Sequence, residues 1–414
     1  MSNIVFFGIP AHGHTNPTLE VVKELTSRGH QVWYYSYEML REKIEAVGAI
    51  FVACDDFDVE KKLSPKDGAR IGKDLVFSTK ILVDTTLALD DKVCEDMKVL
   101  KPDCIVGDSM AVWGKAVAMK LGIPFVSSTT TFAFNKHSAK IMQKDQSLIA
   151  LVRSVLDVGK ANKEIKRLRK KGYSVRNALE LISSDERTHT IVYTSPEFQP
   201  CSETFPDNFV FVGPSIRPTS LAIEKTRDKL IYISLGTVNN DQIDFYLQCI
   251  EALKDTVYQV ILSAGDLISM EALTAAVKEL FGGQIPEQIS IRRHVDQIAV
   301  LQKADVFVSH CGMNSVSESL YFGVPLVMVP QTAEQSGVCE RVAQLGAGIK
   351  LASTDADSIL AAIRTILKDR RYRENAEAVA EGFRRCPGAK GAAEKIESMF
   401  HIAASPCIQW QDEG

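Results

Sequence analysis

Residues 294–335, which read HVDQIAVLQKADVFVSHCGMNSVSESLYFGVPLVMVPQTAEQ, decide the fold of this chain. The stretch holds an apolar run at Val306–Val308, a small polar turn, a helical segment from Ser315 to Phe322, and a second apolar run at Leu326–Val329. Strand, turn, helix and strand in this order build a parallel sheet. The turn places backbone N–H groups at a helix N-terminus directly after a strand. Such a position favours an anion, because the N–H groups and the helix dipole both point toward it.

The same stretch resembles the sugar-nucleotide signature of the family 1 glycosyltransferases, which glycosylate small lipophilic acceptors from UDP-sugars. A pattern of this length is far more specific than a lone glycine-rich loop. The resemblance is strongest to the bacterial macrolide-glycosyltransferase-like branch. The chain departs from the pattern at His294, where Trp is usual, and at Asp296, where Pro is usual. The matching positions are Gln297, His310, Cys311, Gly312, Asn314, Ser315, Glu318, Gly323, Val324, Pro325, Glu334 and Gln335.

This resemblance implies an α/β fold of the GT-B architecture, with two Rossmann-like doubly wound domains that face each other across a cleft. We expect an acceptor-binding domain over residues 1–215 and a nucleotide-sugar-binding domain over residues 216–385. A C-terminal helix within residues 386–405 would pack back on the first domain. The polar stretch from Gly213 to Lys229 is typical of an interdomain linker.

The chain begins with a predicted strand, Ile4–Ile9, and a loop that contains two histidines. Asn16 followed by Pro17 predicts a helix start, with Asn as the cap and Pro at the first helical position. Gly29 would end that helix. The loop lacks the G-x-G-x-x-G pattern, which argues against a nicotinamide-binding fold.

The acceptor hydroxyl needs a base, and a histidine with an ordinary pKa suits this role. His14 corresponds to the family's base, and His12 in the same loop is the alternative. Asp108 follows the predicted strand Cys104–Gly107 and corresponds to the carboxylate that orients the base. Without the signature, the two residues would be read as a loop histidine and a helix cap.

The resemblance also implies the residues that hold the donor. Glu318 would accept from the ribose hydroxyls, and Gln297, the backbone near Val295 and His294 would contact the base. Glu334 and Gln335 would bind hydroxyls of the transferred hexose, for which glucose fits. We expect no metal ion and no prosthetic group. The residues expected at the diphosphate are Gly236, Thr237, His310, Gly312, Asn314 and Ser315.

Composition narrows the function further. The chain has 414 residues, 48 basic against 52 acidic, and a formal net charge of −4, so neither nucleic acid nor an anionic membrane is an expected partner. Nine cysteines without C-x-x-C spacing indicate reduced thiols and a cytoplasmic protein. We predict no membrane span, because no apolar stretch is long enough.

The sequence gives fewer indications of which residues bind the acceptor. Residues 136–185 are predicted to be a charged helical insertion near the acceptor cleft, and Phe77, Trp113, Phe132 and Phe134 are candidates for an apolar pocket or for the core. After the signature, helices are expected at Val342–Gly346, Ala356–Leu367 and Arg371–Phe400.

The first hypothesis is an inverting UDP-hexose transferase that acts on a macrolide, flavonoid or other phenol. Alternatives are a GT-B epimerase, a lipid-linked sugar transferase, a thymidine diphosphate donor in place of UDP, and a non-catalytic sugar-nucleotide sensor.

Overall fold

The computed structural model describes residues 1–59, 61, 63–68, 70, 74–138, 148–236 and 241–400. Thr237, the middle of the predicted insertion at 139–147, and residues 401–414 therefore lie outside the described residues. The chain forms two compact units. The first holds residues 1–193, 201–215 and the segment from Pro387 onward, and the second holds residues 194–200 and 216–386.

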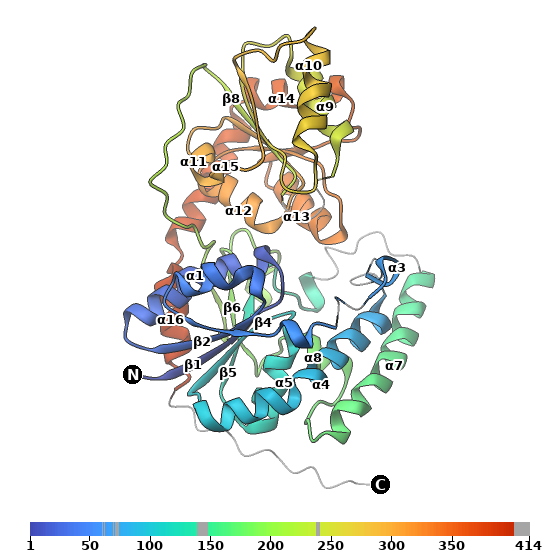
Figure 1. The fold of residues 1–414 in the computed structure, drawn as a ribbon, viewed down its shortest axis with the longest axis vertical. Helices are drawn as coiled ribbons and strands as arrows, with labels where there is room; N and C mark the ends of the chain where they lie inside the picture. The colour runs from blue at the N-terminus through green and yellow to red at the C-terminus, as the bar shows by residue number, and fades with distance from the viewer. Residues whose placement is uncertain are drawn as a thin grey trace. The chain divides into compact units, whose positions relative to one another are not determined.

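The first unit is built on a seven-stranded sheet in the order β3-β2-β1-β4-β5-β6-β7, in which every neighbouring pair is parallel (Figure 1). Both faces of a parallel sheet are covered by helices, so its strands are continuous apolar runs. β1 and β4 at the centre are almost wholly buried. The strands are β1 (Asn3–Phe7), β2 (Gln31–Ser36), β3 (Ile50–Ala53), β4 (Cys104–Asp108), β5 (Phe125–Thr129), β6 (His189–Val192) and β7 (Phe209–Phe211).

Helices of the first unit pack on both faces of this sheet. The long helices α4 and α7 lie side by side, and α16 lies against α1 (Figure 1). The predicted charged insertion is mainly helical where it is described: α7 and α8 fall within it, joined by the non-helical residues 171–177. The helices are α1 (His12–Ser27), α2 (Arg41–Glu45), α3 (Pro65–Gly68), α4 (Leu75–Leu100), α5 (Val112–Leu121), α7 (Leu148–Lys170), α8 (Ala178–Ile182) and α16 (Gly388–Glu397).

The start of α1 corrects the sequence prediction. The helix begins at His12, its N-cap is Ala11, and Pro17 lies inside it. Ala11 is extended, and its carbonyl accepts from the N–H of Thr15 at 3.1 Å, so the helical hydrogen bonds begin well before Asn16. The predicted cap at Asn16 is therefore wrong. The consequence is that the histidine loop is the first helical turn.

The second unit holds a six-stranded parallel sheet in the order β10-β9-β8-β11-β12-β13. β8 and β11 at its centre are buried throughout. The two parallel sheets confirm the predicted fold class. The strands are β8 (Leu230–Ser234), β9 (Gln259–Ser263), β10 (Ile289–Arg292), β11 (Val306–Ser309), β12 (Leu326–Met328) and β13 (Gly348–Lys350).

The helices of the second unit include two that differ from the prediction. α13 begins at Ala333, not near Val342, and the predicted tail Arg371–Phe400 is two helices, α15 and α16, which belong to different units. Pro387, directly before α16, accounts for the break, because proline cannot continue the hydrogen bonds of α15. The helices are α9 (Ile243–Leu253), α10 (Met270–Leu280), α11 (Gln297–Leu301), α12 (Met313–Tyr321), α13 (Ala333–Gln344), α14 (Ala356–Lys368) and α15 (Arg371–Arg385).

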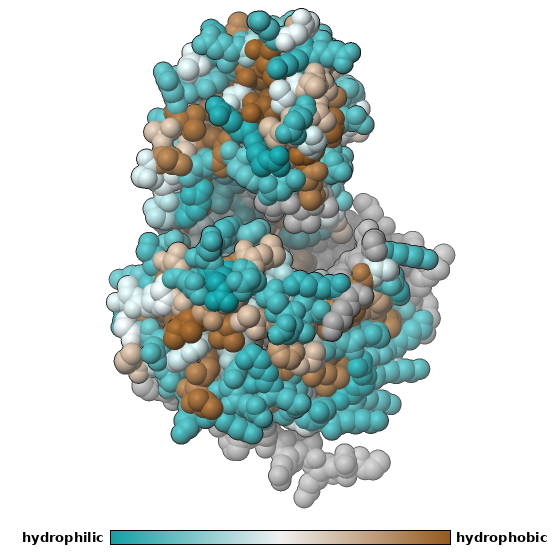
Figure 2. Space-filling model, in the orientation of Figure 1, coloured by the Kyte–Doolittle hydropathy of each residue, from teal (hydrophilic) through white to brown (hydrophobic). Residues whose placement is uncertain are grey.

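The visible surface is mainly hydrophilic. In the face drawn in Figure 2, teal side chains surround small, separate brown patches on each unit. Within the described ranges, no helix combines the length and the apolar composition that crossing a bilayer requires.

Candidate active site

His14 and Asp108 meet at the carboxyl ends of two neighbouring strands of the first sheet. β1 pairs with β4, with Phe7 opposite Gly107, so the turn into α1 emerges beside the end of β4. Nδ1 of His14 lies 2.8 Å from Oδ2 of Asp108. Asp108 is 5 % exposed, and its Oδ1 accepts from the backbone N–H of Met110 at 2.8 Å. Both carboxylate oxygens of Asp108 therefore take part in hydrogen bonds, Oδ1 with the backbone and Oδ2 with the imidazole.

This contact fixes the chemistry of the His14 ring. A carboxylate can only accept a hydrogen bond, so Nδ1 carries the proton and Nε2 carries the lone pair. A lone pair on Nε2 can accept a proton from a hydroxyl group, and Asp108 then stabilises the imidazolium. His12, the alternative base, lies with its Nδ1 3.3 Å from Nζ of Lys43. The geometry favours His14.

A third group, which was not predicted from the sequence, lies at this histidine. Oγ1 of Thr130 lies 3.1 Å from the same Nδ1 of His14, and Thr130 is 3 % exposed. Thr130 is two residues beyond Ser128, which is the register partner of Asp108 in the β4–β5 pair. A run of hydroxyl residues, 127–131, spans the end of β5, but the sequence does not show which of them faces His14.

The predicted diphosphate turn of the second unit is organised around His310. The imidazole lies between two glycines: a Cβ at Gly236 would stand 2.6 Å from Cε1 of the ring, and one at Gly312 would stand 2.7 Å from Nε2. Gly236 also has a φ of +76°, which favours glycine. The ring of His310, rather than a ligand, therefore occupies the space that the missing Cβ of Gly312 leaves.

Burial lowers the pKa of His310 to about 4, so the ring is neutral at pH 7. Its Nδ1 is buried and has no hydrogen-bond partner among the described residues. A neutral imidazole still has one N–H to donate. His310 is thus a neutral donor at a strand end rather than a fixed positive charge.

The N-terminus of α12 follows directly. The helix has Gly312 as its N-cap, and no side chain caps it. Asn314 and Ser315 lie in its first turn and are half-buried. First-turn N–H groups and the helix dipole make this end suitable for an anion.

A hydrogen-bonded cluster joins α11 to α12. Nε2 of Gln297 donates to Oε2 of Glu318 at 2.6 Å and lies 3.4 Å from Oγ of Ser315. The hydroxyl of Tyr232 donates to Oε1 of Gln297 at 3.1 Å. Burial raises the pKa of Glu318. The structure therefore brings together three of the predicted donor residues.

His294 and Asp296, the two positions that depart from the family pattern, each contact a side chain elsewhere in the second unit. The His294 side chain is 59 % exposed, and its Nε2 lies 2.8 Å from Oδ1 of Asp266. Asp296 caps α11 by accepting from the N–H of Ala299, and it forms two hydrogen bonds with Arg217 of the predicted linker, at 2.8 and 3.0 Å. Val295, between them, is half-buried. Asp296 thus anchors the linker and caps a helix, neither of which the usual Pro could do.

Glu334 and Gln335 lie in the first turn of α13. Oγ1 of Thr332 accepts from the N–H of Gln335, and Oε1 of Gln335 accepts from the N–H of Thr332 and of Gln331 at 3.2 and 2.7 Å. This reciprocal pair is a capping box, which the T-x-x-Q spacing could have predicted. Glu334 and Gln335 are therefore positioned by a helix start and not by a polar loop.

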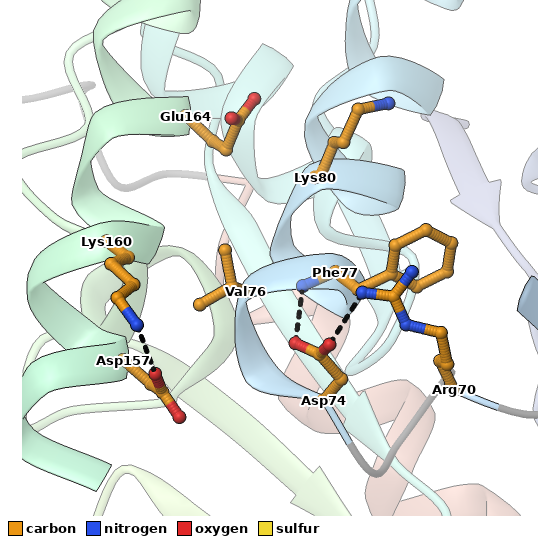
Figure 3. A pocket seen from close by; sticks show the side chains of 8 residues that line it. All are labelled: Arg70, Asp74, Val76, Phe77, Lys80, Asp157, Lys160 and Glu164. Carbon is orange, nitrogen blue, oxygen red and sulfur yellow. Dashed lines mark hydrogen bonds and ion pairs between the residues drawn. The ribbon is translucent and has the colours of Figure 1, made fainter. Parts of the chain in front are cut away.

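The four aromatic residues proposed for the acceptor pocket or the core differ in their burial. Phe132 and Trp113 are buried in the first unit, and Phe134 is 52 % exposed. Phe77 lines a cavity of about 540 Å³ between the start of α4 and α7 (Figure 3). The guanidinium of Arg70 lies 4.2 Å from the centre of the Phe77 ring.

Most of the lining of that cavity is charged. Figure 3 shows Asp74 accepting from Arg70, and Lys160 paired with Asp157 on α7. Lys80 pairs with Asp84 at 2.6 Å. These local pairs neutralise one another, so the cavity by itself does not identify an apolar acceptor.

Comparison with known proteins agrees with this geometry. The family model described as "Erythromycin biosynthesis protein CIII-like, C-terminal domain" matches residues 267–399. The chain is 31 % identical over 410 residues to the uncharacterized UDP-glucosyltransferase YojK of Bacillus subtilis, covering 96 % of this chain and 97 % of that one. It is 32 % identical to the NDP-glycosyltransferase YjiC of Bacillus licheniformis, covering 96 % and 98 %.

A solved structure shows the same fold. The calicheamicin glycosyltransferase CalG4 aligns over 96 % of this chain and 98 % of its own, with a TM-score of 0.78 and 26 % identity. Together with the two parallel sheets, this match confirms the GT-B architecture. The chain therefore belongs to the family 1 glycosyltransferases, in their macrolide-glycosyltransferase-like branch, and is a glycosyltransferase.

Proposed function

We propose that the protein is an inverting glycosyltransferase that moves a hexose from a UDP-sugar, UDP-glucose first among them, to a hydroxyl of a lipophilic small molecule. The observation that carries the proposal is the 2.8 Å contact between Nδ1 of His14 and Oδ2 of Asp108. This pair is the arrangement that a general base for a hydroxyl acceptor requires. A macrolide, a flavonoid or another phenol is the acceptor class.

In this mechanism Nε2 of His14 takes the proton of the acceptor hydroxyl. The acceptor oxygen forms a bond to the anomeric carbon from the side opposite the diphosphate, the bond to the diphosphate oxygen breaks, and UDP leaves with that electron pair. Attack from the opposite face inverts the anomeric centre. Asp108 stabilises the imidazolium and keeps the ring in the competent tautomer.

On the donor side, we assign the diphosphate to the neutral His310, the N-terminus of α12 and the glycines that hold the ring, Gly236 and Gly312. Groups that donate hydrogen bonds to the leaving diphosphate act without proton transfer, since they are in place before charge develops. Asn314, Ser315 and Thr237 complete this set.

We assign different residues to the nucleoside and to the transferred sugar. Glu318 is assigned to the ribose hydroxyls, and Gln297, Val295 and His294 are assigned to the base. The hexose hydroxyls are assigned to Glu334 and Gln335. UDP is proposed because one relative is named a UDP-glucosyltransferase, while the name NDP-glycosyltransferase of another keeps thymidine diphosphate sugars as the competitor to test. The eight described cysteines are free thiols, which supports a cytoplasmic location.

The direct test is release of UDP from UDP-glucose in the presence of a panel of phenolic and macrolide acceptors, with product masses recorded. The proposal requires a product heavier by one hexose, with inverted anomeric configuration by NMR. Thymidine diphosphate glucose is run in parallel to decide the base. Release of UDP no faster than in a blank with every acceptor would defeat the proposal, and conversion of the donor alone would indicate an epimerase.

A further inference from the structure

Two hydrogen-bonding groups compete for one nitrogen at the base. Nδ1 of His14 is 2.8 Å from Oδ2 of Asp108 and 3.1 Å from Oγ1 of Thr130. Both partners are buried, with 5 % and 3 % of their surfaces exposed. Asp108 ends β4 and Thr130 directly follows β5, the neighbouring strand, so the two partners approach the ring from adjacent positions of one sheet edge.

The two partners differ in what they can do. A carboxylate only accepts, whereas a threonine hydroxyl can either accept or donate. While Asp108 holds the proton on Nδ1, the oxygen of Thr130 can only accept from that N–H, and its own hydrogen points away from the nitrogen. Without the carboxylate, the hydroxyl can donate to Nδ1, which places the ring proton on Nε2.

The position of this proton decides whether the ring can act as a base. With the proton on Nδ1, Nε2 has a lone pair for the acceptor hydroxyl. With the proton on Nε2, that lone pair is absent and the ring cannot take a proton at this atom. The same hydroxyl therefore supports one tautomer or the other according to what stands at position 108.

We propose that Thr130 is a positioning residue whose effect on His14 reverses sign with Asp108. With Asp108 present, Thr130 is a second acceptor that holds the ring in its competent tautomer. With Asp108 absent, Thr130 holds the incompetent tautomer. This inference rests on the proposed function for its kinetic consequence, but its structural content concerns only the ring of His14.

The first experiment compares Thr130→Val, which has the same shape without the hydroxyl, with Thr130→Ser, which keeps it. Thr130→Val is expected to lower kcat roughly 3- to 10-fold, the scale of one shared hydrogen bond, and to leave KM for the donor unchanged. Thr130→Ser should stay within about 2-fold of wild type. Thr190→Val is the matched control, because Thr190 is a fully buried threonine of the same sheet whose hydroxyl donates only to a backbone carbonyl, that of Thr188.

The second experiment places the same change in Asp108→Ala. There, adding Thr130→Val should raise kcat several-fold above Asp108→Ala alone, because it removes the donor that holds the wrong tautomer. A merely structural role predicts a further loss. If Asp108→Ala does not fold, the Val and Ser variants in the wild-type background decide the question.

The third measurement needs no substrate. The 15N signals of the His14 ring, assigned by comparison with His14→Gln, report which nitrogen is protonated. Nδ1 should be protonated in wild type, unprotonated in Asp108→Ala, and shifted back toward protonated in the double variant. Identical Nδ1 signals in the last two, or a Thr130→Val enzyme as active as wild type, would overturn the proposal. A wild-type protein that transfers no sugar would defeat the proposed function and leave this reading intact.

Discussion

Two histidines lie just beyond the carboxyl end of a central parallel strand, one in each unit: His14 in the first turn of α1, and His310 in the turn between β11 and α12. His14 has a carboxylate at 2.8 Å, while His310 lies between two glycines and its Nδ1 has no partner in the part of the chain that the structure describes. The carboxylate gives the first ring a fixed tautomer, and burial makes the second ring a neutral donor. One residue type near a strand end thus has two different environments, and we propose the first histidine as the base and the second as a ligand of the diphosphate.

Removing the base is the strongest way to test this difference. His14→Ala should lower kcat roughly 10²- to 10⁴-fold, the usual contribution of a general base, while donor KM changes little. Initial rates of UDP release measure it. His12→Ala is the matched control and should stay near wild type. Equal losses in the two variants would mean that the loop, and not the His14–Asp108 pair, carries the activity.

Changing the carboxylate to an amide replaces the acceptor at Nδ1 of His14 with a possible donor. Asp108→Asn should lower kcat on the order of 10²- to 10³-fold, because the amide can donate to Nδ1 and hold the proton on the wrong nitrogen. Its Oδ1 can still accept from the N–H of Met110, so the unfolding temperature should change by only a few degrees. A variant with more than a tenth of wild-type activity would contradict the assigned role of Asp108.

Disturbing the glycines tests the other histidine. Gly312→Ala puts a Cβ 2.7 Å from Nε2 of His310, so the ring must move. We expect a roughly 10-fold weaker affinity for UDP, measured by calorimetry, and a loss of about 1–3 kcal/mol of folding free energy. Gly159→Ala in α7 is the control: its Cβ meets nothing within 4 Å, and it should leave stability unchanged or raise it by about 0.5–1 kcal/mol. Unchanged UDP affinity in Gly312→Ala would separate His310 from the donor site.

The lowered pKa of His310 gives a pH signature. Free protein keeps the ring neutral down to about pH 4, and a bound diphosphate raises the pKa of the ring by its negative charge. UDP binding should therefore take up a fraction of a proton as the pH falls toward 5, and none at pH 8. Calorimetry in two buffers of different ionisation enthalpy measures the uptake. The same uptake in His310→Gln would assign it to another group.

The smallest expected effect concerns the altered start of the signature. His294→Trp restores the family's usual residue and increases the stacking area for a base, so the affinity for UDP should rise about 2- to 5-fold. His294→Ala should weaken it by a similar factor. If neither variant changes the affinity, the exposed His294–Asp266 pair does not contact the donor.

The sequence predicted most of the fold because the central strands of parallel sheets are apolar runs between turns, and β1, β4, β8 and β11 have this form. It also pointed to His14 and Asp108 through the motif. It placed the start of α1 too late, because Asn16–Pro17 is a strong local signal and the hydrogen bonds of the preceding turn override it.

Two features of the site depend on contacts that the sequence does not specify. The contact of Thr130 with His14 depends on the β4–β5 register, which no local pattern specifies. The environment of His310 depends on Gly236, which lies 74 residues earlier in the chain and meets the ring only once the sheet is formed. Gln335 was open to a local prediction, since the spacing of its capping box is visible in the sequence.

The packing of α16 on α1 has a consequence for synthesis. Arg28 at the end of α1 forms an ion pair with Glu397, 369 positions later, and Val21, Val22 and Leu25 share a core cluster with Ile396. At ribosomal rates of about 5–20 residues per second, α16 is synthesised roughly 20–75 s after the end of α1. The part of the first unit's core that α16 completes therefore forms only after the second unit has been synthesised, so the first unit is the last to be completed.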